Sequence, residues 1–429
     1  MTNYCKLKEE IISKSLDNVL LEIYKDSSLI PYLQERFCTA IDRFHDIFHD
    51  DDIEIYSAPG RTEVGGNHTD HQHGRVLAAS INKDAIAVVS AAENVKLLSC
   101  ASDSIISINI NDLDKKDSEE GTTESLIRGV LAGLKKSGYK IGGFNAYVTS
   151  DVLIGAGLSS SAAFETLIGT IISGLYNNGE ISPIEIAKTG QYAENVYFGK
   201  PCGLMDQMAS SVGGLVTIDF KDPSTPIVEK VDFDLSSKGY SLCITDTKAD
   251  HVNLTPDYAA VPEEMKKAAA VFGKEYLREV SPEEIYANIS LIREKVSDRA
   301  ALRALHFITE NSRVEEQVNA LKNGDFSRFL KSVSASGDSS FKYLQNVYTN
   351  RDIDHQAVSI ALAISDILLH KDNSDHGVAR VHGGGFAGTI AAFVENDFVS
   401  TYKEKMDKTF GEGSCSILQI RPVGGIKLF

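Results

Sequence analysis

The chain of 429 residues is poor in positive charge, with 43 Lys and Arg against 60 Asp and Glu and a formal net charge of −17. Nucleic-acid binding needs a basic face, so this balance argues against a nucleic-acid partner. The sequence also lacks an apolar run long enough to span a bilayer, and we expect no membrane partner. Residues 1–20 mix Lys and Glu without an apolar core, so we expect no secretory signal there.

Paired cysteine spacings are absent as well. The six cysteines are scattered along the chain, which is typical of reduced thiols and predicts a cytoplasmic location. Internal repeats and low-complexity tracts are missing too. The length allows two or three domains with substantial cores. Strand-like and helical runs interleave in both halves, which predicts an α+β fold in two lobes. A stretch rich in Pro, Asp and Ser at 221–226 predicts a boundary between them.

The segment from Gly155 to Ala163 reads Gly-Ala-Gly-Leu-Ser-Ser-Ser-Ala-Ala and joins a strand-like run to an amphipathic helical pattern. Small residues let the backbone approach an anion, and a helix N-terminus directs N–H groups at it. No Walker lysine follows, so a bound phosphate would need positive charge from elsewhere, most simply from a metal ion. The alternative is an ordinary Gly/Ser turn before a core helix.

Residues 58–74 are dense in polar and ionisable groups between two apolar strands. Arg61 carries a permanent, rigid cation suited to phosphate. Asn67, His68 and Asp70 offer the donors and acceptors needed to bind a polyhydroxylated ligand. A polar surface loop is one alternative, and a transition-metal site is another. The metal-site alternative arises because four residues of metal-ligating types lie here, although their spacing matches no standard zinc pattern: His68, Asp70, His71 and His73.

Two later segments also carry chemistry. Asp206 follows Gly203 at a predicted helix start, where a lone Asp is usually an N-cap. Three glycines at 383–385 lie between strand-like runs. Their cost in chain entropy indicates either a tight turn or a close approach of the backbone to a ligand.

In this order and spacing, the segments resemble the signature motifs of the GHMP kinases, and within that superfamily those of galactokinases. The resemblance runs from about residue 45 to the C-terminus. The matching segments are the galactokinase signature at 58–61 and 66–70, the ATP loop at 155–163, the catalytic-aspartate segment at 202–207, a helix at 303–311 and the C-terminal glycine motif at 383–388.

The resemblance implies a two-lobed α+β GHMP kinase fold with an extra N-terminal helical segment. Its first lobe would resemble a ribosomal-protein domain, and its second would be ferredoxin-like. The expected divisions are an extension at 1–45, an N-terminal lobe at 46–222 and a C-terminal lobe at 223–429.

The implied reaction is transfer of a phosphoryl group from ATP to the anomeric hydroxyl of galactose. Asp206 would be the general base, and Arg61 would stabilise the transferring group. Because an adjacent arginine lowers a carboxyl pKa, we expect Asp206 to orient the hydroxyl and accept its proton late. The partners would be the sugar and ATP, with the chain a monomer or, alternatively, a homodimer. The implied binding residues are Asn67, His68, Thr69, Asp70 and Tyr258 for the sugar, Gly155, Ala156, Gly157, Leu158, Ser159, Ser160 and Ser161 for ATP, and Ser161 and Glu194 for Mg²⁺.

The chain departs from the family pattern at several positions. The usual Gly-Glu-His-Thr-Asp-Tyr is Gly-Asn-His-Thr-Asp-His at 66–71, and the usual Arg-Val-Asn-Leu-Ile is Arg-Thr-Glu-Val-Gly at 61–65. The usual Asn-x-Arg-Arg after Tyr258 is absent. In the family, the Glu at the Asn67 position lies at the sugar 6-hydroxyl. Loss of its charge predicts a galacturonate kinase as an alternative, and a non-catalytic galactose/ATP sensor is a further alternative.

Overall fold

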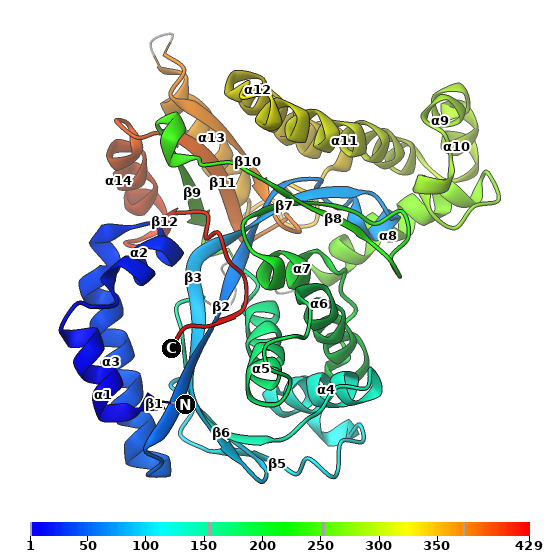
Figure 1. Cartoon of the computed structure of the whole chain (residues 1–429). Helices are drawn as coiled ribbons and strands as arrows, with labels where there is room; N and C mark the ends of the chain where they lie inside the picture. Colours follow the sequence, from blue (N-terminus) through cyan, green and yellow to red (C-terminus); the bar gives the residue numbers. More distant parts are fainter. Residues whose placement is uncertain (1, 153–156, 250–253, 372–373) are drawn as a thin grey trace.

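The computed structural model describes residues 2–152, 157–249, 254–371 and 374–429, and it contains two β-sheets (Figure 1). The first sheet has nine described strands, in the order β1-β2-β3-β6-β4-β5, with β13 paired to β2 and the β7–β8 hairpin paired to β3. Its strands are β1 (Thr2–Asn3), β2 (Asp52–Gly65), β3 (Arg75–Ala92), β4 (Val95–Ser99), β5 (Ile106–Ile108), β6 (Gly143–Ser150), β7 (Leu215–Asp219), β8 (Ile227–Val231) and β13 (Ile426–Lys427).

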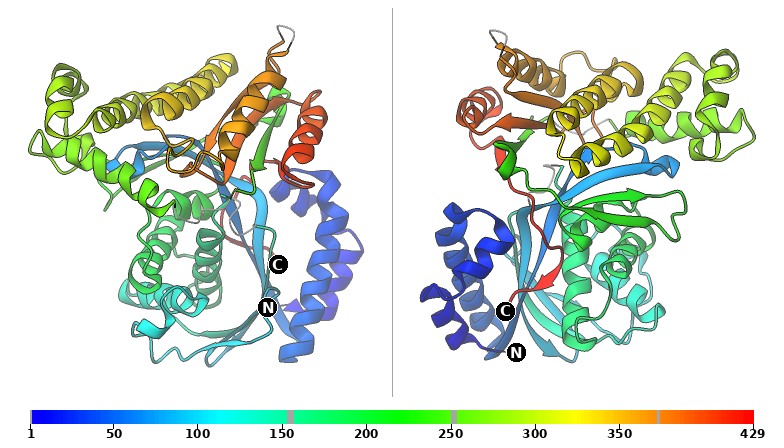
Figure 2. Two further views of the ribbon diagram at one scale, coloured as in Figure 1. Left: turned by 180° about the vertical axis from the view of Figure 1, so that it is seen from behind. Right: turned by 45° about the horizontal axis from the view of Figure 1, so that its top comes forward.

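Helices cover both faces of this sheet (Figure 2). Apolar side chains of β2 pack against both groups of helices, because successive side chains in a strand point to opposite faces of the sheet. Ile55 packs with the N-terminal helices, whereas Tyr56 packs with the helices on the other side. The first group is α1 (Tyr4–Ile12), α2 (Asp17–Tyr24) and α3 (Ile30–Phe48); the second is α4 (Thr123–Lys136), α5 (Ser160–Tyr176), α6 (Pro183–Tyr192) and α7 (Met205–Val212).

The second sheet is antiparallel, with the order β10-β11-β9-β12. Its strands are β9 (Tyr240–Asp246), β10 (Gly377–His382), β11 (Thr389–Glu395) and β12 (Cys415–Leu418). The helices of this half are α8 (Thr255–Ala270), α9 (Pro282–Ala287), α10 (Ile289–Lys295), α11 (Asp298–Lys322), α12 (Phe326–Ser339), α13 (Ala357–Leu369) and α14 (Val399–Phe410). In the described part of the chain, no helix combines the length and apolarity that a membrane span requires.

The two lobes have the mixed helix and sheet content that the sequence predicts, but the predicted boundaries need correction. The boundary at 222/223 falls in the turn between β7 and β8, which pair with each other in the first sheet. A hairpin turn and a linker share the same Pro, Asp and Ser composition, which explains the error. The boundary at 45/46 falls inside α3, and β13 returns the C-terminus to the first sheet beside β2.

Candidate active site

Strand β2 carries the first motif into the centre of the molecule. The sequence pattern predicts a strand only at 53–56, yet β2 continues to Gly65, with register shifts against β3 after Pro59 and after Glu63. The backbone of β2 lies directly against residue 158 of the ATP-loop segment. A side-chain carbon on Gly60 would lie 2.8 Å from the Leu158 carbonyl oxygen, so only glycine fits this approach.

Arg61 and Asp206 form a bidentate ion pair. Nε of Arg61 lies 2.7 Å from Oδ1 of Asp206 and Nη2 lies 2.6 Å from Oδ2, while Nη1 donates to the Gly157 carbonyl at 2.5 Å. The pair therefore joins the first motif, the ATP-loop segment and the aspartate segment. Leu204, not Asp206, is the N-cap of α7, so the N-cap interpretation of Asp206 is wrong. Burial alone would raise the pKa of Asp206, but the Arg61 charge and hydrogen bonds outweigh it and the net pKa is lowered.

Ser159 holds the second oxygen of the same carboxylate. Its backbone is left-handed, with φ at 57°, and its hydroxyl donates to Oδ2 of Asp206 rather than capping helix α5. A non-glycine residue in this region costs free energy and indicates a functional constraint. Ser160 begins α5 and Leu158 is buried just before it. The predicted ATP-loop residues Gly155 and Ala156 lie outside the described residues.

The Ser161 hydroxyl contacts the Glu194 carboxylate at 3.3 Å, which joins the two residues predicted to hold Mg²⁺. Glu194 lies in a π-helical turn at Ala193–Phe198, a geometry that is frequent at functional sites. Lys200 donates to the same carboxylate oxygen at 3.3 Å, and Gln207 donates to the other at 2.9 Å. Ser161 and Glu194 are oxygen ligands of the type that Mg²⁺ prefers.

The transition-metal interpretation of the histidine-rich loop finds no support. Within the described ranges, no group of three or more His, Cys, Asp or Glu side chains is arranged to hold a metal ion. His73 instead stacks on Tyr276, with ring centroids 3.7 Å apart. Mg²⁺ usually binds through only one or two carboxylates together with substrate phosphates, so the absence of such a group does not argue against the predicted Ser161–Glu194 site.

A cavity of about 200 Å³ opens beside the Arg61–Asp206 pair. Of the predicted sugar residues, His68 and Asp70 line it. Glu63, for which the motifs predict no role, lines it too. Burial raises the pKa of Glu63 despite the opposing charge of Arg380. The lining residues come from β2, the loop that follows it, the segment before α7, the first turn of α7 and the glycines at 383–384: Arg61, Glu63, His68, Asp70, His71, Pro201, Cys202, Gly203, Met205, Asp206, Gly383 and Gly384.

His68 presents a free acceptor in this cavity. Its Nε2 lies 3.0 Å from the Gly384 carbonyl oxygen, which can only accept, so Nε2 carries the hydrogen. The other ring nitrogen, Nδ1, is buried without a protein partner. Burial lowers the pKa of His68 to about 3, with a smaller contribution from His71, so the ring is neutral at physiological pH. Nδ1 can therefore accept a hydrogen bond from a ligand hydroxyl.

Two residues predicted to contact the sugar, Asn67 and Thr69, do not line the cavity. Both residues have no exposed surface and neither lines the cavity. The Asn67 amide donates to the Gly383 carbonyl at 2.7 Å and to Glu63 at 3.0 Å. The Thr69 hydroxyl donates to the carbonyls of Gly66 and Arg75. Both side chains hold the loop in shape and are absent from the cavity lining.

Tyr258 supports the glycine turn instead of lining the cavity. Its hydroxyl donates to the Gly385 carbonyl at 2.6 Å, and its ring lies 2.7 Å from where a side-chain carbon on Gly384 would be. The turn connects β10 and β11, so the triple glycine does make the tight turn that the sequence suggests. Tyr258 thus fixes the backbone of Gly384, whose neighbour Gly383 also lines the cavity.

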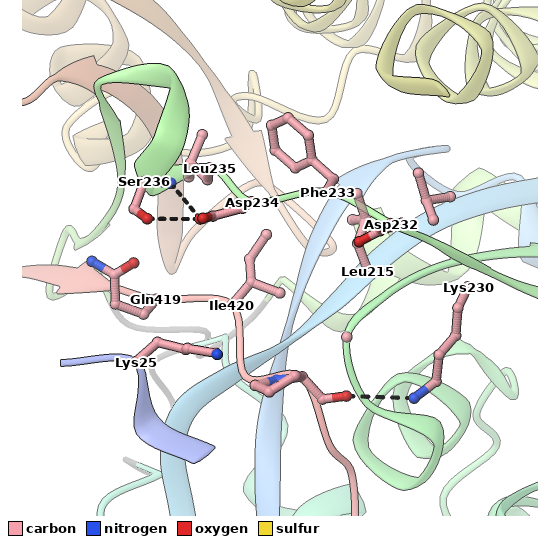
Figure 3. Close-up of a pocket in the computed structure, with 13 residues that line it drawn as sticks. Lys25, Leu215, Lys230, Asp232, Phe233, Asp234, Leu235, Ser236, Gln419 and Ile420 are labelled. Atoms are coloured by element: carbon pink, nitrogen blue, oxygen red, sulfur yellow. Dashed lines mark hydrogen bonds between the residues drawn. The ribbon is translucent and has the colours of Figure 1, made fainter. Parts of the chain in front are cut away.

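A second cavity, of about 440 Å³, lies between the C-terminal segment, the strand β8 and the end of α2 (Figure 3). Lys25, Lys230, Asp232 and Asp234 line it, and Lys230 donates to the carbonyl of Pro422 at 3.4 Å. None of its lining residues belongs to the three motifs. The smaller cavity at the Arg61–Asp206 pair is therefore the candidate active site.

Comparisons with known proteins identify the superfamily to which this fold belongs. Residues 125–214 match the family model of the GHMP kinases N terminal domain, and residues 42–91 match the galactokinase galactose-binding signature. A mevalonate kinase crystal structure, only 16% identical, aligns over 86% of this chain and 99% of its own at a TM-score of 0.60, which shows a shared fold. The fold and site together define a GHMP kinase.

Closer similarity lies within one branch of that superfamily. Galactokinase of Glaesserella parasuis is 31% identical over 366 residues, covering 82% of this chain and 88% of the relative. Galactokinase of Streptomyces coelicolor is 29% identical over 378 residues, covering 87% and 92%. The structure of Lactococcus lactis galactokinase complexed with galactose has 25% identity and a TM-score of 0.76, covering 90% of this chain and 98% of that chain. The chain is an enzyme of the galactokinase family.

Proposed function

We propose that this enzyme transfers the γ-phosphoryl group of ATP to the anomeric hydroxyl of galactose, giving galactose 1-phosphate and ADP. One observation carries the proposal: Arg61 joins Asp206 to the Gly157 carbonyl at the edge of a polar cavity. The phosphate-binding segment and the acceptor site therefore meet at one carboxylate. The cavity, with its polar lining, suits a hydroxylated ligand of sugar type.

Asp206 orients the acceptor hydroxyl and accepts its proton late in the reaction. Its lowered pKa makes it a weak base toward a free hydroxyl. Phosphoryl transfer passes through a loose transition state, in which the attacking hydroxyl needs little prior deprotonation. Positioning and charge neutralisation then dominate, and Arg61 supplies a fixed positive charge beside the reacting groups.

Ser161 and Glu194 would hold Mg²⁺ with the ATP phosphates. The bound ion would neutralise phosphate charge, which a Walker lysine supplies in other nucleotide-binding loops. Lys200 lies 3.3 Å from the same Glu194 carboxylate and would help to hold it in position in the absence of the ion. The residues Gly157 to Ser161 would contact the phosphates through their backbone and hydroxyl groups.

Galactose is favoured over galacturonate, because the galacturonate alternative assumed that the cavity had lost a carboxylate at position 67. Asn67 is buried and does not line the cavity, so its lack of charge does not remove a carboxylate from the cavity wall. Glu63 and Asp70 instead place two carboxylates on the cavity wall. A cytoplasmic location and a monomeric or homodimeric state remain predictions from the sequence.

Replacement of Asp206 tests the proposal directly. We expect Asp206→Asn to lower kcat for galactose phosphorylation by about 10²–10⁴-fold, the usual contribution of a general base. The Kd for galactose, measured by calorimetry, should change little, because the amide retains an oxygen acceptor. Asp234→Asn in the second cavity is the matched control and should leave kcat unchanged. A kcat for Asp206→Asn within about threefold of the wild type would refute the role of this carboxylate.

A further inference from the structure

Glu63 and Asn67 form a buried carboxylate–amide pair at the edge of the sugar cavity. Nδ2 of Asn67 lies 3.0 Å from Oε1 of Glu63 and 3.3 Å from Oε2. Only the carboxylate member of the pair lines the cavity, because Asn67 is fully buried behind it. The chain therefore presents a negative group to the ligand from strand β2, four residues before the position where the family pattern has its glutamate.

The protein uses every hydrogen-bonding atom of the Asn67 amide. Nδ2 donates to Glu63 and to the Gly383 carbonyl, while Oδ1 accepts from Asn346 at 2.8 Å and from Ser340 at 3.3 Å. A carboxylate at this position would bring its oxygens against the Glu63 carboxylate and the Gly383 carbonyl. An amide at 67 is thus the partner that a carboxylate at 63 requires.

Arg380 fixes the Glu63 carboxylate from the side of the second sheet. Its Nη2 lies 2.5 Å from Oε1 of Glu63, and its Nη1 donates to the Val64 carbonyl at 2.9 Å. Both side chains are almost fully buried, with 1% of Arg380 and 4% of Glu63 exposed. Oε1 is therefore occupied by Arg380 and Asn67, whereas the contact of Oε2 with Asn67 is the longer one at 3.3 Å. Oε2 has the greater remaining capacity to accept a hydrogen bond.

The sequence pattern agrees with an exchange of the two residue types. The usual motif has Asn at the position of Glu63 and Glu at the position of Asn67, and this chain has the reverse. The exchange retains one carboxylate and one amide in the motif. Asp70 adds a second carboxylate to the cavity wall, and the one arginine that lines the cavity is already paired with Asp206.

We propose that Glu63 determines sugar specificity in this enzyme: its carboxylate accepts a hydrogen bond from a hydroxyl of a neutral hexose and repels sugars that carry a carboxylate. This inference rests on the proposed sugar kinase function and names the class of sugar that the cavity takes. Removing the Glu63 charge should weaken discrimination against uronates more than it weakens use of the neutral sugar.

The test compares kcat/KM for galactose and galacturonate in the wild type and in Glu63→Gln, with ATP and Mg²⁺ saturating. The wild type should prefer galactose, and Glu63→Gln should reduce that preference at least tenfold. Glu310→Gln is the matched control, because Glu310 is a fully buried carboxylate that holds Gly66 N–H at 3.0 Å outside the cavity. It should change the melting temperature without changing the preference.

A reciprocal exchange separates this role from a purely structural one. Asn67→Glu should lower kcat/KM at least a hundredfold or prevent folding, because two carboxylates would then share one contact. The double variant Glu63→Asn/Asn67→Glu should recover at least tenfold in activity over Asn67→Glu, or recover the folded state. Failure of this recovery, or an unchanged sugar preference in Glu63→Gln, would overturn the inference.

The outcome for the wild type distinguishes the two proposals. If the wild type phosphorylates galactose and galacturonate equally well, the specificity inference fails while the kinase function stands. If it phosphorylates a different neutral hexose, the galactose assignment fails, and the specificity role is measured with that hexose and its uronate. Preference of the wild type for a uronate over its neutral hexose would overturn the specificity role.

Discussion

Asp84 is the centre of a buried charge network that joins the N-terminal helices to the catalytic sheet. The carboxylate, on β3, has no exposed surface and pairs with Arg36 of α3 at 2.7 Å and with Arg421 at 2.9 Å. The hydroxyls of Tyr24 and Ser57 each donate to it at 2.5 Å. Asp84→Asn keeps the shape and part of the hydrogen bonding but leaves two buried guanidinium groups short of a counter-charge.

We expect this substitution to cost about 3 kcal/mol of unfolding free energy. Loss of one partner from a buried pair usually costs about 3–5 kcal/mol, and the lower end applies because Arg36 keeps a second carboxylate. That carboxylate is Asp151, which directly follows β6 and lies 3.0 Å from Arg36. With a urea slope of about 3 kcal/mol/M, the unfolding midpoint should fall by about 1 M. The chain has no tryptophan, so far-ultraviolet circular dichroism is the suitable signal.

The pH dependence of stability gives a second measurement of the same network. Burial alone would raise the pKa of Asp84, but Arg36 and Arg421 outweigh it and the net pKa lies below the ordinary value of 3.8. The carboxylate therefore contributes stability above pH 3.8, and the contribution is lost as the pH falls through the lowered pKa. In Asp84→Asn, the free energy of unfolding should therefore depend less on pH below pH 3.8. Glu263→Gln, which removes an exposed pair with Lys267, is the control and should leave the midpoint unchanged. A midpoint for Asp84→Asn equal to that of the wild type would refute the reasoning.

Two further predictions concern the phosphate side of the active site. Ser159→Ala removes a hydrogen bond to the Asp206 carboxylate, so the pKa of Asp206 should rise and kcat should fall about tenfold or more; an unchanged acid limb of the kcat–pH profile would contradict this. Glu194→Gln removes the charge that faces Ser161, so the Mg²⁺ concentration for half-maximal activity should rise at least tenfold at constant ATP. If Mg²⁺ dependence stays as in the wild type, the ion is held elsewhere.

Regular patterns in the sequence predict the long elements well. The apolar run at 76–90 predicts β3, which spans Arg75–Ala92, and the pattern at 126–136 predicts α4, which spans Thr123–Lys136. The second half of β2 is missed because residues 57–65 contain Pro, Gly and charged residues that favour loops locally. Pairing with β3 and burial between the lobes override that preference and place Arg61 on a strand.

The active-site ion pair shows what pattern alone does not predict. Arg61 and Asp206 are 145 positions apart, and neither has a local feature that identifies the other as its partner. Periodicity reports which face of an element is buried, but not which two elements meet. For this pair, the order and spacing of the motifs within a known family supplied the expectation, and the distances between their side chains now give it a physical basis.

Asn67 shows a different limit, because the sequence motif does not reveal which other side chains the residue contacts. The residue lies in the loop that borders the cavity, as the motif predicts. Its neighbours Gly66 and His68 both have left-handed backbones, with φ of 90° and 60°, and His68 lines the cavity whereas Asn67 does not. A motif gives the positions of residues along the chain, whereas the backbone conformation determines which of their side chains line the cavity. Since Glu63 supplies the carboxylate that Asn67 lacks, a substitution at one motif position is best interpreted together with the residue that its side chain contacts.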